Sequence, residues 1–151
     1  MSDSGFITNA AEQTGITTAY NSGQGIALTE AVAADANSVH GSLPAAGAVW
    51  SHLRLVLDET VGTTAAISAF LTWDAAGNDI AAGPTQSTFS TEAGLSDTSL
   101  RMVVIPMDNI VPRMPASGTQ GQLTLWLKTD AGTVTCPVGG AELHWYRYGN
   151  T

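Results

Sequence analysis

The chain has 151 residues, of which 44% are hydrophobic and 12% are charged, and its formal net charge is −8. This length is typical of one domain, which buries roughly 70% of its unfolded surface and needs no disulfide or metal to fold. Disordered chains combine low hydrophobicity with high charge, so the composition excludes that class. The five basic residues are scattered and include a single lysine. Nucleic acids and anionic membranes are bound mostly by clustered Lys and Arg, so neither is an expected partner.

Residues 1–47 are predicted to form an extended N-terminal arm. They are rich in Ala, Thr, Ser, Asn and Gly and contain few large apolar side chains. Short strands are predicted at residues 15–20 and 25–29, and a helix over residues 30–36 with Thr29 as its cap. Ordering a residue costs about 1–2 kcal/mol of backbone entropy, so we expect the arm to pack on partners rather than form a core. No secretory signal and no apolar stretch of membrane-spanning length is evident in the sequence.

Residues 48–151 are predicted to form a β-sandwich domain. Alternating apolar and polar residues, typical of strands with one buried face, recur about every ten residues. The segments are residues 50–57, 65–73, 100–105, 122–128, 134–136 and 141–148. Hairpin turns are predicted at residues 74–79 and 129–133. A strand is predicted to end at Gly83-Pro84, and another to end or bend at Pro106. The predicted fold class is an all-β, antiparallel β-sandwich of the jelly-roll-like kind.

The sequence marks no catalytic or metal-binding constellation. His40, His52 and His144 lie far apart, whereas zinc needs three or four converging ligands. Cys136 is the single cysteine and is interpreted as a small apolar filler. The turn at residues 74–79 could offer oxygens to calcium, but such side chains usually cap their own backbone. We therefore predict no cofactor, no metal and no enzymatic activity. An enzyme with an unmarked pair of carboxylates stays an alternative.

The aromatic side chains are the most informative ones. Leu123, Leu125 and Leu127 alternate with Trp126, so both faces of that strand are apolar. Its outer face then requires a cover, supplied by the arm, by a loop or by another subunit. The residues predicted to lie at an interface are Trp50, Trp126, His144, Tyr146 and Tyr148.

With its acidic, Lys-poor and Thr/Ala/Gly-rich composition, its polar arm and its strand–turn units at residues 50–83 and 100–148, the chain resembles the capsid decoration (cement) proteins of tailed bacteriophages. The resemblance contains no sequence motif, so no functional residue is transferred. It implies a virion protein on the capsid exterior, made in the host cytoplasm, that binds the major capsid protein and stabilises the head. It also implies a homo-oligomer, most commonly a trimer.

Two other binding roles stay open. The chain could be a piece of a phage tail or baseplate. It could also be a receptor- or carbohydrate-binding module, in which exposed Trp and Tyr side chains serve as stacking platforms for sugars. The environment of the aromatic residues distinguishes these roles from the capsid role.

Overall fold

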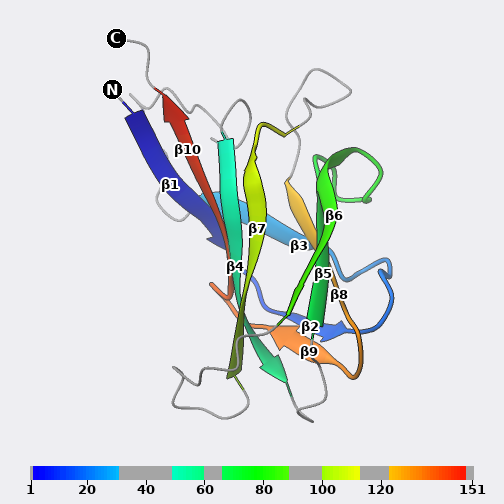
Figure 1. The fold of residues 1–151 in the computed structure, drawn as a ribbon. Coiled ribbons are helices and arrows are strands. Elements are labelled where there is room, and N and C mark those ends of the chain that lie inside the picture. Colours follow the sequence, from blue (N-terminus) through cyan, green and yellow to red (C-terminus); the bar gives the residue numbers. More distant parts are fainter. Residues whose placement is uncertain (1, 31–48, 60–65, 89–99, 113–122, 149–151) are drawn as a thin grey trace.

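The computed structural model describes residues 2–30, 49–59, 66–88, 100–112 and 123–148, and every helix or strand in these ranges is a β-strand (Figure 1). The strands are β1 (Ser2–Asn9), β2 (Gln13–Ile16), β3 (Ile26–Glu30), β4 (Val49–Glu59), β5 (Ala66–Thr72), β6 (Ile80–Thr88), β7 (Leu100–Ile110), β8 (Thr124–Thr129), β9 (Val134–Cys136) and β10 (Ala141–Tyr148). All their pairings are antiparallel. The prediction of an all-β, antiparallel fold is therefore confirmed. Within these ranges, no helix could cross a membrane.

Strand β3 connects two groups of strands. In the first group, β7, β4, β10, β1 and β3 pair in that order. In the second group, β3, β8, β5 and β6 pair in that order. The first half of β3 pairs with β8 and its second half with β1, so the strand passes from one group to the other. Figure 1 shows β1, β10, β4 and β7 along one side of the molecule and β5, β6 and β8 along the other. The short strands β2 and β9 pair together, and β9 also pairs with the end of β4.

Alternation of side chains directs the apolar residues of both groups into one core. In β4, Leu53, Leu55 and Leu57 are fully buried, whereas the residues between them are partly exposed. On the second group, Ile67 and Leu71 of β5 are buried in the same hydrophobic cluster. Successive side chains of a strand point to opposite faces, so regular stretches of β4 and β5 contribute every second residue to the core.

The predicted N-terminal arm is wrong for residues 2–30. Strand β1 lies between β10 and β3, and Ile7, Ile16 and Leu28 are fully buried. The prediction counted large apolar residues along the segment, but a strand needs only one at every second position to join a core. A domain boundary after residue 47 therefore does not separate residues 2–30 from the remaining strands. Of the predicted helix, Glu30 ends β3, and residues 31–36 lie outside the described ranges, as does the rest of the arm to residue 47.

Strand β7 continues through Pro106, so of the two predicted outcomes, an end or a bend, the strand end does not occur. Proline cannot donate a ladder hydrogen bond, and it is tolerated because the only described strand that pairs with β7 is β4. Beyond it, Asp108 and Asn109 have φ angles of 55° and 56°. Asn and Asp adopt this left-handed region more readily than other residues with a side chain. The register between β7 and β4 shifts here, next to His52.

Strand β6 also continues past its predicted end, through Gly83-Pro84. Gly83 has a φ of 90°, and a Cβ at this position would lie 2.8 Å from the carbonyl oxygen of Ala69. The register with β5 shifts between Ala69 and Leu71. The glycine therefore allows a bulge that keeps β6 paired.

The end of β1 is fixed by the side chain of Asn9, which is 1% exposed. Its Nδ2 donates to the carbonyl oxygens of Pro137 (2.9 Å) and Ala11 (3.0 Å). Its Oδ1 accepts from the backbone N–H of Ala141 at 3.0 Å, and its own carbonyl oxygen accepts from the N–H of Gly139 at 3.0 Å. A buried amide satisfied in this way ties β1 to the turn between β9 and β10.

We expect Asn9→Ala to lower the free energy of unfolding by about 2–4 kcal/mol, because it leaves the buried Ala141 N–H without its acceptor. It also removes one of the donors to the Pro137 carbonyl, which keeps the N–H of Gly140. Urea unfolding followed by tryptophan fluorescence measures the change. Gln13→Ala is the control, because the Gln13 amide also donates to two backbone carbonyls but lies at a more exposed site. The Gln13→Ala substitution should lower the free energy of unfolding by less than about 1 kcal/mol. Equal losses in the two variants would show that Asn9 has no special role.

Candidate functional site

Of the five residues predicted to lie at an interface, Trp50 is instead part of the core. It is 0% exposed. Strict alternation from Leu53 would direct Trp50 outward, but Ser51 is an extra residue of β4 at the point where its register with β10 shifts. Such a bulge returns Trp50 to the inner face. His144 and Tyr146 are partly exposed on β10, and Tyr148 ends that strand.

Trp126 faces away from the core, and its own chain covers it. The indole Nε1 donates to Thr72 Oγ1 at 3.1 Å, and the ring stacks on Phe70 with centroids 5.9 Å apart. The backbone at Gly25 and at Gly77 approaches so closely that a Cβ at either position would lie within 3.0 Å of the indole. The N-terminal segment and a turn therefore supply the cover that the sequence requires. Trp126 is 5% exposed and needs no second subunit to bury it.

The turn at residues 74–79 is held by its own carboxylate. Asp74 Oδ1 accepts the backbone N–H groups of Asn78 and Asp79, both at 3.0 Å. The hydrogen bond from the Asp79 N–H is the largest cause that lowers the pKa of Asp74. The arrangement is the self-capping turn that Asx residues commonly form. The Asp74 carboxylate thus has a structural role that requires no calcium.

The thiol of Cys136 is buried beside Asn9. Burial raises its pKa to about 12, against a smaller opposite effect of the hydrogen bond from Asn9. Nucleophilic cysteines have lowered pKa values, because the thiolate is the reactive form. Cys136 is therefore a packing residue, as interpreted from the sequence.

His52 and His144 meet on the outward side of β4 and β10. They are directly opposite in register, and their rings stack with centroids 4.3 Å apart and planes 13° apart. Ser51 Oγ lies 3.0 Å from His52 Nδ1 and 3.2 Å from the carbonyl oxygen of His144. Alternation indicated that each histidine points outward, but it does not tell which strands are neighbours. Sequence reasoning therefore missed this pair.

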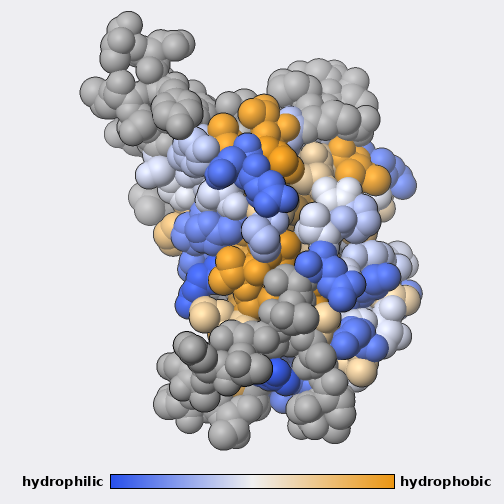
Figure 2. Space-filling view, viewed as in Figure 1, coloured by the Kyte–Doolittle hydropathy of each residue, from blue (hydrophilic) through white to orange (hydrophobic). Residues whose placement is uncertain are grey.

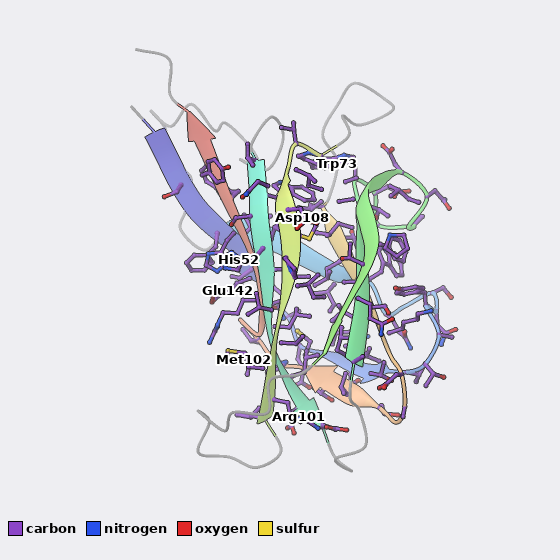
Figure 3. The ribbon with its side chains drawn as sticks, in the orientation of Figure 1. His52, Trp73, Arg101, Met102, Asp108 and Glu142 are labelled. Atoms are coloured by element: carbon purple, nitrogen blue, oxygen red, sulfur yellow. The ribbon has the colours of Figure 1, made fainter. Side chains whose placement is uncertain are left out.

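Charged side chains extend the histidine pair along the sheet. Glu142 Oε1 lies 3.1 Å from His144 Nε2, and Glu142 Oε2 lies 3.6 Å from Arg54 Nη1. We call His52, His144, Glu142 and Arg54 the histidine patch; Figure 3 shows His52 and Glu142 near each other on the sheet. Burial lowers the pKa of His52, the charge of His144 lowers it further, and Glu142 raises it.

The histidine patch does not have the geometry of a metal centre. The nearly parallel rings keep their nitrogen lone pairs in separate planes, whereas metal ligands converge on one point. Across the ranges that the structure describes, no group of three or more His, Cys, Asp or Glu residues is placed to hold a metal ion.

Apolar side chains flank the histidine patch. Register places Phe6, His144, His52 and Pro106 in one row across β1, β10, β4 and β7, with Val104 in the next row. Phe6 is 41% exposed and Val104 is 43% exposed, and the Phe6 ring centroid lies 5.4 Å from that of His144. Figure 2 shows apolar surface over the middle of β4 and β7 beside hydrophilic surface. We call the outward side chains of these four strands the outer face.

No protein-family model matches the chain, and no curated protein matches it. Function is therefore inferred from geometry. The outer face offers exposed apolar side chains, ring faces and paired ions on the surface of a sheet. These are the elements of a binding surface.

We expect His144→Gln to raise the pKa of His52 toward its ordinary value of 6.5, because it removes a positive neighbour, and Glu142→Gln to lower it further. An NMR titration of the imidazole resonances measures both shifts. A lowered pKa in the folded state means that stability is lost as the pH falls through about 6.5 toward the folded value. Shifts of the same sign in the two variants would contradict this electrostatic account.

Proposed function

We propose that this chain is a structural virion protein, a capsid decoration or cement protein that binds the outside of a phage head and stabilises it. The observation that best supports this function is the outer face. Phe6 and Val104 present exposed apolar area there, while Arg54 is already paired with Glu142. Docking around these residues buries apolar area, and the ion pair means that neither Arg54 nor Glu142 is left as an isolated buried charge, which would be strongly destabilising. The partner is the major capsid protein, and the role involves no chemical step.

The finer architecture that we propose is a jelly-roll-like β-sandwich that assembles as a homotrimer on the capsid exterior. Support for the sandwich comes from one core shared by the two groups of strands and from β3, which passes between them. Support for self-association comes from the composition. With 12% charged residues and a single lysine, the chain has few long charged side chains to immobilise at an interface.

A receptor- or carbohydrate-binding module of a phage tail is the second candidate. Exposed tryptophans do not support it, because Trp50, Trp73, Trp126 and Trp145 are each 6% exposed or less. The observation that favours it is a polar groove on the second group of strands. That groove is independent of the outer face, so the two functions can be tested separately.

We expect phage heads assembled without the protein to rupture at a lower temperature than heads to which it has been added back. A ligand that binds only the assembled shell stabilises it by about 2.7 kcal/mol per site at a hundredfold excess over Kd. Val104→Asp places an unpaired charge in the outer face and should weaken binding at least about tenfold. Release of packaged DNA on heating measures rupture, and gel analysis of washed heads measures occupancy.

Ile80→Asp is the matched control, because Ile80 is also 43% exposed but lies on β6 in the other group of strands. It should bind heads as the unmodified chain does. Equal rupture temperatures with and without the protein would reject the cement role. Equal loss of binding in the two variants would reject the outer face as the docking surface.

A further inference from the structure

A polar groove of about 270 Å³ lies on the outward side of β5, β6 and β8, the strands that run together in Figure 1. Pockets for drug-sized ligands are about 300–1,000 Å³, so this volume suits one small polar molecule. The polar lining consists of Thr18, Ser68, Gln86, Lys128, Thr129 and Asp130. Hydroxyl, amide, ammonium and carboxylate groups therefore meet in one place.

Lys128 is the cation of this groove and the single lysine of the chain. Its Nζ lies 5.1 Å from the centroid of the Tyr20 ring, a distance at which the ring face attracts a cation. The Tyr20 ring packs edge-on against Phe70 at 4.7 Å, which fixes its position. Among the described residues, no carboxylate lies within 4.0 Å of Lys128 Nζ, whereas Arg54 and Arg101 are each paired with one. Lys128 is thus held by an aromatic ring and offers its charge to an anion.

The other groups that line the groove suit a ligand with hydroxyl groups better than a ligand with two negative charges. Ser68 Oγ lies 3.4 Å from Gln86 Oε1, and this arrangement orients the Gln86 amide at the edge of the groove. Asp130 Oδ1 accepts the backbone N–H of Ala66 at 3.2 Å, which fixes the carboxylate. A phosphate dianion would be repelled by Asp130, whereas a monoanion with several hydroxyls can pair with Lys128 and donate to the acceptors.

We propose that this groove binds an acidic sugar residue, with its carboxylate on Lys128 and its hydroxyls on Ser68, Gln86 and Asp130. The site is separate from the outer face and goes beyond the capsid role. The groove lies on β5, β6 and β8, whereas the outer face lies on the other group of strands. A chain bound to a head through its outer face would therefore not use the groove for that contact. The ligand class is a uronic-acid-type sugar, as occurs in acidic polysaccharides.

Glucuronic acid is the probe, titrated into the full chain and followed by changes in amide NMR resonances. We expect saturable binding with a Kd of roughly millimolar, as suits one shallow polar site. Lys128→Gln should weaken it about tenfold or more, because a charge-assisted hydrogen bond contributes roughly that much. Glucose tests the hydroxyls without the charge, and acetate tests the charge without the hydroxyls. Both should bind at least about tenfold more weakly.

Arg54→Gln is the control variant, because it removes a cation from the other group of strands and should leave glucuronic acid binding unchanged. Resonances that shift on binding should belong to the residues around Lys128. Acetate or glycine binding as tightly as glucuronic acid would replace the sugar site with a general carboxylate or amino-acid site and overturn the proposal. Failure to saturate at about 50 mM, far above a millimolar Kd, would overturn it as well. Either result would leave the proposed capsid role of the outer face unchanged, because that role is tested separately by the rupture of phage heads.

Discussion

The fold depends on the two hydrogen-bonded edges of β1. One edge pairs with β10 from Ser2 to Thr8, and the other pairs with β3 from Ile7 to Asn9. Through β3, the same strand connects the first group of strands to the second. Ile7 is fully buried beneath this ladder. Removing β1 would leave backbone groups of β10 and β3 without partners and would open the core, and both changes are strongly destabilising.

The ladder that closes the core also builds the outer face. Because β10 lies between β1 and β4, register places Phe6 beside His144 and His144 beside His52. A slip of one residue in any of these pairs would turn the outward side chains into the core, so the apolar pattern that fixes the core also fixes the surface. The extra residue at Ser51 shows the same coupling, because it keeps Trp50 buried while the histidines stay stacked outside.

Local patterns in the sequence predict local structure well here. Alternation correctly indicated the buried leucines of β4, and the composition of the turn at residues 74–79 correctly indicated that Asp74 caps its own backbone. The sequence did not indicate that Gly25 and Gly77 would lie against Trp126. Their lack of a side chain lets the backbone approach and cover the indole ring.

Features that depend on which strands are neighbours could not be predicted. The histidine pair forms because β4 and β10 are adjacent, and no local pattern contains that information. Strand β1 was missed because its sequence is largely polar and Ile7 is its one fully buried apolar residue. A strand of this kind is ordered mainly by its two ladders, which only the complete fold provides. The groove at Lys128 likewise combines the N-terminal segment with three distant strands.

Deletion of residues 2–9 tests most directly whether the N-terminal segment is an integral part of the fold. Near-ultraviolet circular dichroism of the shortened chain, recorded during thermal unfolding, reports fixed packing around the four tryptophans. We predict that the shortened chain lacks both the native near-ultraviolet signal and a cooperative transition, because β10 and β3 lose the strand between them. A shortened chain with the native signal and a cooperative transition would contradict the account and would restore the N-terminal segment as an arm.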